Sequence, residues 1–139
     1  MKFYSNSAAE TEKIGEKLAS RLKGNEVIAF YGDLGAGKTT FTRGLANYFG
    51  LKEQVSSPTF ALVHEYGKNK IKIYHFDMYR IESVEDLEST GFFDYLDRGI
   101  ILIEWSENIE KYIPSNTIII NIEKNAENSR IIDIEGIEL

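Results

Sequence analysis

One glycine-rich segment of the chain reads Gly32-Asp33-Leu34-Gly35-Ala36-Gly37-Lys38-Thr39 and fits the pattern G-x-x-x-x-G-K-[ST]. An apolar run, Val27–Tyr31, precedes it, and a helix-like stretch, residues 40–49, follows it. A buried strand, a glycine-rich turn and a helix in this order predict a phosphate-binding P-loop. They also predict an α/β fold, because the strand before such a loop belongs to a central sheet.

Each part of this segment has a physical role beside a nucleoside triphosphate. Glycines let the backbone wrap tightly, so that N–H groups and the positive end of the following helix point at the β-phosphate. Lys38 is predicted to bridge the β- and γ-phosphates, and the Thr39 hydroxyl to bind Mg²⁺. The alternative is a plain strand-to-helix turn with Lys38 as a surface charge, but such a turn requires neither the lysine nor the hydroxyl.

Length and composition restrict the rest of the molecule. The 139 residues suit one domain, 1–139, with a central sheet and helices packed on it. The sequence lacks cysteine, a membrane-spanning apolar run and the apolar core of a signal peptide, so we expect a cytoplasmic protein without membrane contact. Its formal charge of −6 repels polyanions, so we expect no direct, non-specific binding of nucleic acid.

Three helices are predicted from capping and periodicity. A capping box at Ser7 and Glu10 begins the first, whose apolar residues recur every four positions and which Gly24 is expected to end. The second covers residues 40–49 after the glycine-rich loop, and the third covers 83–89. The first helix is expected to cover one face of the sheet.

The strands predicted from apolar runs and alternation form a mixed parallel and antiparallel sheet of the P-loop NTPase type, with helices on both faces. Two are buried parallel strands, and two form an antiparallel hairpin across residues 67–69. The predicted strands are 27–31, 60–66, 70–77, 100–103, 117–122 and 130–134.

A P-loop enzyme also requires a carboxylate at the end of a second buried strand, where it holds the Mg²⁺ shell or orients the attacking water. Glu104 follows four apolar residues, 100–103, and fits this requirement. Asp77 ends the strand 71–76, whose alternating pattern predicts a half-exposed strand rather than a central one. Both residues remain candidates for orienting the water.

Several other residues have two interpretations. Arg80 is either a cation at the phosphates or a surface salt-bridge partner of a nearby glutamate. Residues 56–59 form either a nucleotide-sensing switch or an ordinary turn. Trp105 is expected to pack in the core or anchor an interface. His64 and His75 are expected to pack or form hydrogen bonds, since the sequence separates them too far to suggest a metal pair.

The features of common P-loop classes are missing from the sequence. It has no N-K-x-D segment for reading guanine and no serine- and glycine-rich signature of ATP-cassette proteins. Only five arginines are scattered along the chain, which does not fit the arginine-rich lid of a nucleoside kinase. What remains is a minimal ATPase.

The ordered motifs resemble the TsaE proteins, also called YjeE, a family of bacterial P-loop ATPases needed for threonylcarbamoyladenosine formation in tRNA. The resemblance covers roughly residues 5 to 135. It rests on residues 32–44, Ser57-Pro58-Thr59-Phe60, His75-Phe76-Asp77-Met78-Tyr79-Arg80 and Ile103-Glu104-Trp105.

The resemblance implies specific sites for ATP and Mg²⁺. It implies that Thr39 and Glu104 hold Mg²⁺, that Asp77 supports the metal or the water, and that 57–59 and 77–80 act as switch segments. Adenine is then expected between the N-terminal segment and the loop at 129–130. The implied nucleotide contacts are Asp33, Gly35, Ala36, Gly37, Lys38, Thr39, Thr40, Ala8, Thr11 and Arg130.

The resemblance also implies partners. TsaE proteins act with a complex of TsaB and TsaD that transfers threonylcarbamoyl to tRNA, and ATP hydrolysis is expected to reset this complex between turnovers. Contact with tRNA is then only indirect. Two rival functions remain open: a nucleotide-gated adaptor in which ATP binding alone orders the switch segments, and a small-molecule kinase.

Overall fold

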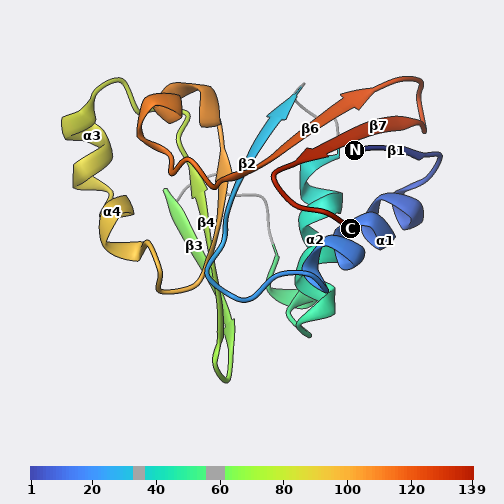
Figure 1. Cartoon of the computed structure of the whole chain (residues 1–139), viewed down its shortest axis with the longest axis horizontal. Coiled ribbons are helices and arrows are strands. Elements are labelled where there is room, and N and C mark those ends of the chain that lie inside the picture. The colour runs from blue at the N-terminus through green and yellow to red at the C-terminus, as the bar shows by residue number, and fades with distance from the viewer. Residues whose placement is uncertain (33–36, 56–61) are drawn as a thin grey trace.

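Seven strands form one mixed sheet in the part of the chain that the structure describes (Figure 1). The computed structural model describes residues 1–32, 37–55 and 62–139. In the sheet order β1-β7-β6-β2-β5-β4-β3, the four strands β6, β2, β5 and β4 are parallel, whereas β1, β7 and β3 are antiparallel to their neighbours. The strands are β1 (Lys2–Ser5), β2 (Val27–Gly32), β3 (Val63–Lys68), β4 (Ile71–Asp77), β5 (Ile100–Glu104), β6 (Ile118–Lys124) and β7 (Arg130–Glu135).

Helices cover both faces of this sheet, as predicted. Figure 1 shows α1 and α2 on one side and α3 and α4 on the other. Among the described residues, no helix is both long and apolar enough to cross a bilayer. The helices are α1 (Ala8–Ala19), α2 (Lys38–Tyr48), α3 (Val84–Ser89) and α4 (Phe92–Tyr95), with 3-10 turns η1 (Lys52–Gln54) and η2 (Ser106–Tyr112).

Alternate residues of the central strands supply two separate cores. Ile100 and Leu102 of β5 join the cluster under α1 and α2, whereas Ile101 and Ile103 join the cluster under α3 and α4. Since successive side chains of a strand point to opposite faces, a strand buried on both sides reads as a continuous apolar run. This is the pattern from which β2 and β5 were predicted.

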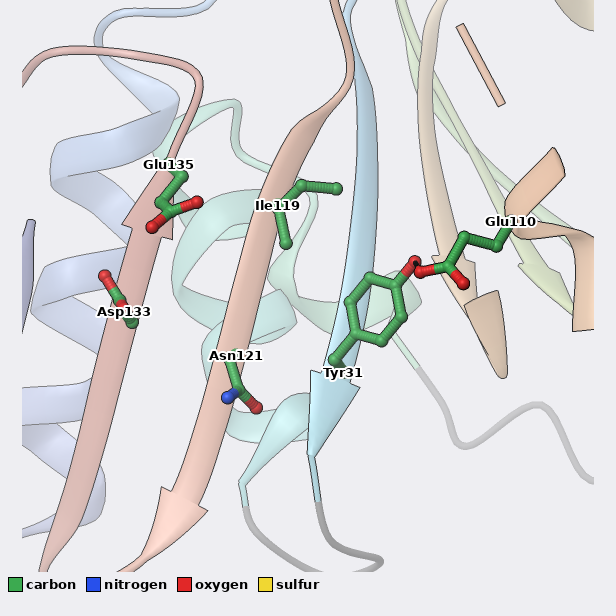
Figure 2. Close-up of a pocket in the computed structure, with 6 residues that line it drawn as sticks. All are labelled: Tyr31, Glu110, Ile119, Asn121, Asp133 and Glu135. Carbon is green, nitrogen blue, oxygen red and sulfur yellow. Dashed lines mark hydrogen bonds between the residues drawn. The ribbon is translucent and has the colours of Figure 1, made fainter. Parts of the chain in front are cut away.

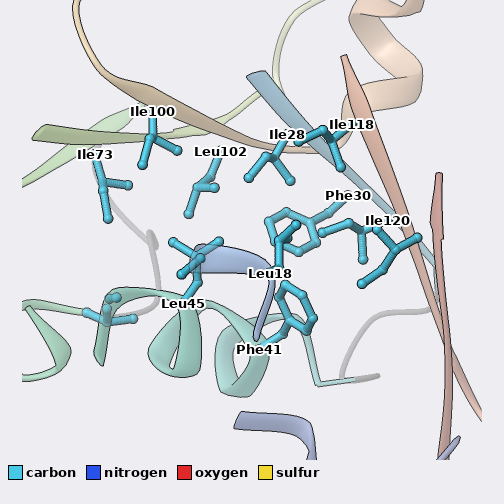
Figure 3. Packing of buried hydrophobic residues seen from close by; sticks show 14 of the residues in the cluster. Leu18, Ile28, Phe30, Phe41, Leu45, Ile73, Ile100, Leu102, Ile118 and Ile120 are labelled. Atoms are coloured by element: carbon cyan, nitrogen blue, oxygen red, sulfur yellow. The ribbon is translucent and has the colours of Figure 1, made fainter. Parts of the chain in front are cut away.

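The core under α2 holds the helix against the strand that precedes it. Phe30 of β2 packs edge-on against Phe41 of α2, with ring centroids 5.8 Å apart, and Leu18 and Leu45 lie beside them (Figure 3). Burying each such side chain fully contributes about 1.5–3 kcal/mol. The end of β2 and the start of α2 are therefore fixed relative to each other.

Two glycines allow α1 and α2 to pack backbone against backbone. A Cβ added at Gly44 of α2 would collide with the carbonyl oxygen of Glu12, and a Cβ added at Gly15 of α1 would collide with that of Phe41. Both colliding groups are backbone atoms, which cannot rotate away. The close approach of the two helices therefore depends on these glycines.

We expect Gly44→Val to lower the free energy of unfolding by about 3 kcal/mol, because the new side chain forces the two helices apart in a well-packed core. Urea denaturation followed by circular dichroism measures this change. Lys13→Ala, an exposed change on α1, serves as the control and should leave the transition in place. An unchanged urea midpoint for the Gly44 variant would contradict the close-packing argument.

The structure corrects the prediction that β4 is half-exposed. Residues Ile73–Phe76 are all buried, because β4 lies inside the sheet between β5 and β3 and is covered on both faces. The alternation arises from Lys72, which is half-buried, and from His75, which is polar yet buried and hydrogen-bonded. A satisfied buried polar residue gives the same sequence pattern as an exposed one.

Smaller differences concern element boundaries. Helix α1 ends at Ala19, before the predicted stop at Gly24. The hairpin turn falls at residues 69–70 rather than 67–69, with Asn69 in the left-handed region at a φ of 59°. Strand β1 and the short segments α4 and η2 were not predicted. The predicted helix after Ser83 is confirmed, since the Ser83 hydroxyl accepts a hydrogen bond from the Asp86 N–H.

Candidate functional site

The residues predicted to carry chemistry gather where the parallel strands end. Strands β4 and β5 are paired so that Asp77 lies directly beside Glu104 at their carboxyl ends. Strand β2 runs parallel to β5 and ends at Gly32, and the chain returns as α2 from Lys38. In open α/β sheets, ligands bind at this carboxyl edge.

Glycines stand on both sides of the loop that joins β2 to α2. Gly32 has a φ of +122°, and a Cβ added there would collide with the carbonyl oxygen of Ile122 on β6. Gly37 has a φ of +106° and stands at the N-cap of α2, where no side chain caps the helix. The first-turn N–H groups of an uncapped helix, together with its dipole, favour an anion. The predicted contacts Asp33, Gly35 and Ala36 lie outside the described residues.

Glu104 is held by a buried hydrogen bond. Its Oε2 lies 2.7 Å from Nε2 of His75, and the two side chains are 18% and 2% exposed. Burial alone would raise the pKa of the Glu104 carboxyl, but the hydrogen bond from His75 and the charges of His75 and Lys38 outweigh burial and lower that pKa. Glu104 is therefore an anion at neutral pH, and Lys38 interacts with it electrostatically.

Asp77, like Glu104, is half-buried. Its Oδ1 accepts a hydrogen bond of 3.0 Å from the backbone N–H of Tyr79, which shapes the turn after β4. The two carboxylates come from adjacent strands, and both lie on the face that α2 covers, since Ile73 and Leu102 at alternate positions pack there. The site thus combines two carboxylates with the lysine and the hydroxyls that begin α2.

The residues predicted near the adenine surround a hollow beside the start of α2. It is lined by Ser7, Ala8, Thr11, Gly37, Thr40, Glu127, Asn128 and Arg130. Elements far apart in sequence meet here: the first turn of α1, the first turn of α2 and the β6–β7 turn. Predicted contacts from both ends of the chain are thus brought to one place.

Two of these residues also have structural roles. The Thr11 hydroxyl lies 2.7 Å from the Ser5 hydroxyl and is buried, so it joins β1 to α1. The Arg130 guanidinium donates to the carbonyl oxygens of Ala126, Glu127 and Ser129 and so braces the β6–β7 turn.

Another hollow lies on the opposite face of the sheet and does not suit phosphate. Figure 2 shows five of its lining residues projecting from β2, β6 and β7 on the side away from α1 and α2, with Glu110 of η2 beside them. Three of the lining residues, Glu110, Asp133 and Glu135, are acidic and would repel a triphosphate. Burial, the charges of Glu110 and Glu107 and the hydrogen bond to Glu110 raise the pKa of Tyr31 to about 12, which reflects the negative potential there.

Arg80 and Trp105 follow the carboxyl ends of β4 and β5. Arg80 is exposed, and the structure records no ion pair for it within the described residues. Trp105 is not in the core: it is 38% exposed, has a φ of 60° and packs edge-on against exposed Tyr79. The predicted switch residues 56–59 lie outside the described residues.

The two histidines are closer together than the sequence suggested. His64 of β3 and His75 of β4 face each other directly in the antiparallel register. No group of three or more potential metal ligands of the His, Cys, Asp and Glu type was found among the described residues. The contact between His75 and Glu104 was not predicted from the sequence. One signal was available: His75 and Asp77 occupy alternate positions of the same strand, so their side chains lie on the same face of the sheet.

The chain is similar to a known protein family and to several of its members. The family model "Threonylcarbamoyl adenosine biosynthesis protein TsaE" matches residues 5–132. The tRNA threonylcarbamoyladenosine biosynthesis protein TsaE of Rickettsia conorii is 42% identical over 130 residues, which is 93% of this chain and 74% of that protein. The protein of the same name from Bacillus subtilis is 35% identical over 138 residues, or 99% and 86% of the two chains.

A solved structure shows the same fold. The crystal structure of Bacillus subtilis YdiB superposes with a TM-score of 0.74 at 30% sequence identity and covers 95% of this chain and 82% of that chain. The family match extends over most of the sequence, from β1 to β7, and includes both carboxylates at the strand ends. The chain therefore belongs to the TsaE family of threonylcarbamoyl adenosine biosynthesis proteins.

Proposed function

We propose that this protein binds ATP with Mg²⁺ and hydrolyses it in support of threonylcarbamoyladenosine formation in tRNA. The observation that carries the proposal is the pairing of Asp77 with Glu104 at the carboxyl edge, with Lys38 interacting with Glu104 from the start of α2. Membership of the TsaE family supports the link to tRNA modification. The motif at 32–39 supports a triphosphate as the ligand.

The donor groups at this edge fit Mg²⁺. Carboxylate and hydroxyl oxygens are hard ligands of the kind that Mg²⁺ prefers, and a site with few protein ligands leaves room for phosphate oxygens and water. Thr39 and Glu104 would hold the ion, with Asp77 supporting it or the water. Bound there, Mg²⁺ would neutralise charge on the phosphates.

The protein's own side chains and backbone groups would carry out the steps of ATP hydrolysis. Lys38 and the first-turn N–H groups of α2 bind the phosphates and orient the γ-phosphorus. Glu104 or Asp77 accepts a hydrogen bond from the attacking water and aligns its oxygen. The bond from water oxygen to the γ-phosphorus forms as the bond to the bridging oxygen breaks, which yields ADP and phosphate. Turnover by the protein alone is expected to be slow.

The hollow beside the start of α2 is proposed to hold the nucleoside. Ala8 and Thr11 on one side and Arg130 on the other lie next to Gly37 and Thr40, so a base placed there continues directly from the phosphate loop. The lining combines the methyl groups of Ala8 and Thr11 with polar side chains, which suits a base that has apolar faces and polar edges.

The partner is proposed to be a complex of TsaB and TsaD, with tRNA contacted through that complex. Phosphoryl transfer depends on positioning and charge neutralisation, and a missing arginine or a mobile water-orienting group costs about 10³–10⁵ in rate. A partner that supplies or fixes such a group would accelerate hydrolysis. The chain's charge of −6 suits action through a protein rather than direct contact with tRNA.

The decisive measurement is phosphate release by the purified protein with Mg²⁺-ATP, with and without the TsaB–TsaD complex. We expect slow release alone and faster release with the complex, without acceleration by small metabolites. Acceleration by a metabolite alone would identify a kinase instead. Absence of phosphate release in every mixture, with ATP binding retained, would overturn the ATPase proposal in favour of an adaptor.

A further inference from the structure

Three side chains from three neighbouring strands form a hydrogen-bonded chain that ends at Glu104. The hydroxyl of Tyr66 on β3 lies 3.0 Å from Nδ1 of His75 on β4, and Nε2 of His75 lies 2.7 Å from Oε2 of Glu104 on β5. The rings of Tyr66 and His75 also touch edge-on, with centroids 6.0 Å apart. The chain of contacts leads from the β3–β4 hairpin to the carboxyl edge.

The Glu104 carboxylate fixes the direction of its hydrogen bond with His75, and the direction of the Tyr66–His75 bond follows for a neutral imidazole. The Glu104 carboxylate only accepts, so Nε2 of His75 carries a proton and donates it. In the neutral ring Nδ1 is then an acceptor, and the Tyr66 hydroxyl donates to it. Tyr66 thus selects the ring form whose N–H points at Glu104, as the partners of metal-binding histidines do.

Burial makes this arrangement rigid. Tyr66 and His75 are each 1% exposed, enclosed in the core of the sheet, so neither ring has room to turn. Turning the imidazole would leave a buried nitrogen without a partner, which is costly. Glu104 stands at the end of this fixed chain and is the member that reaches toward solvent.

We propose that His75, held by Tyr66, is a positioning residue that orients the Glu104 carboxylate for metal binding or water alignment. The hydrogen bond occupies Oε2 and leaves Oε1 as the oxygen offered to the Mg²⁺ shell or the attacking water. This inference rests on the proposed ATPase function. A purely structural role does not require these groups, because well-packed apolar side chains stabilise a buried site at least as well as a buried polar pair.

The first test measures the ring itself, without nucleotide. The chain has only two histidines, so ¹⁵N spectra of the imidazoles are assigned with His64→Gln. We expect a protonated Nε2 on His75 in the free wild-type protein and a changed Nε2 signal in Glu104→Gln. A His75 ring protonated at Nδ1 alone would overturn the inference whatever the activity.

The second test compares kcat for phosphate release with the Kd for ATP. His75→Leu is expected to lower kcat about 10–100-fold, the usual cost of losing an outer partner of a metal ligand, with little change in Kd. His75→Gln keeps an N–H donor near the position of Nε2 and should recover part of the loss. Tyr66→Phe, which keeps the ring but removes the hydroxyl, should give a smaller decrease.

His64→Gln is the matched control, because it changes the histidine directly opposite in the register and should leave kcat near the wild-type value. If His75→Leu does not fold, as judged by thermal unfolding, His75→Phe, which keeps an aromatic ring without a hydrogen-bond donor, takes its place. Wild-type kcat in the folded variant without the donor would overturn the positioning role while the ATPase proposal stands. If the wild-type protein does not hydrolyse ATP, the ATPase proposal is refuted. The ¹⁵N spectrum of the His75 ring then still tests the hydrogen bond to Glu104.

Discussion

Lys38→Ala is expected to raise the Kd for Mg²⁺-ATP by about 100-fold or more. A hydrogen bond between charged groups contributes about 1.5–3 kcal/mol, and every 1.4 kcal/mol is a factor of ten in Kd. Lys38 also interacts favourably with Glu104, so its removal leaves that carboxylate as an uncompensated negative charge beside the phosphates. Isothermal titration with Mg²⁺-ATP measures the effect directly.

The control for this change is Lys13→Ala, which removes an exposed lysine of α1 and gives the chain the same net charge. Thermal unfolding of both variants checks that the Lys38 variant is folded. If Lys38→Ala binds ATP as tightly as the Lys13 control, the lysine does not contact phosphate. The segment 32–39 would then be a strand-to-helix turn without a ligand role.

The parts of the fold that were predicted correctly have a local cause in the sequence. Strands β2 and β5 read as apolar runs because α-helices cover both of their faces, and the start of α3 reads as a capping motif because Ser83 and Asp86 are three residues apart. Such signals lie within a few residues of the structure that they specify. They were sufficient to predict a mixed sheet with helices on both faces.

The missed elements depend on partners far along the chain. Strand β1 has four residues and pairs with β7, in the register Lys2 to Asp133, so its stability comes from contacts that no local pattern records. Strand β4 was read as half-exposed from its alternating pattern, to which His75 contributes, although Tyr66 and Glu104 satisfy this side chain from the two adjacent strands. Burial of a polar residue is decided by these tertiary contacts rather than by its own type.

The same limit applies to the candidate site. Glu104 and Asp77 were identified because each acid directly follows a strand, and parallel pairing brings such positions together. The chain through Tyr66 and His75 crosses three strands, and its geometry follows from the register of β3 with β4 and of β4 with β5. The sequence shows which chemical groups these residues carry, but it does not show that they are in contact.

Glu104→Gln is expected to keep ATP binding and to lower the rate of hydrolysis about 10²–10³-fold, the usual effect of removing one preorganised electrostatic group from a transition state. The lowered pKa of Glu104 means that it acts as an anion near neutral pH, and the amide has nearly the same shape without the charge. Asp77→Asn is the parallel change at the neighbouring strand end. Phosphate release under single-turnover conditions, together with titration of ATP, separates the chemical step from binding.

The ratio of the two losses assigns the roles. Because both side chains occupy equivalent positions in the β4–β5 register, the variant with the greater loss of rate at saturating Mg²⁺ identifies the residue that aligns the water. A loss that excess Mg²⁺ restores identifies a metal ligand instead. Full turnover by both variants would overturn the assignment of this edge as a hydrolytic site.

If Glu104→Gln binds ATP without hydrolysing it yet sustains many turnovers of the TsaB–TsaD complex, nucleotide binding alone regulates the partner, and the protein acts as an adaptor.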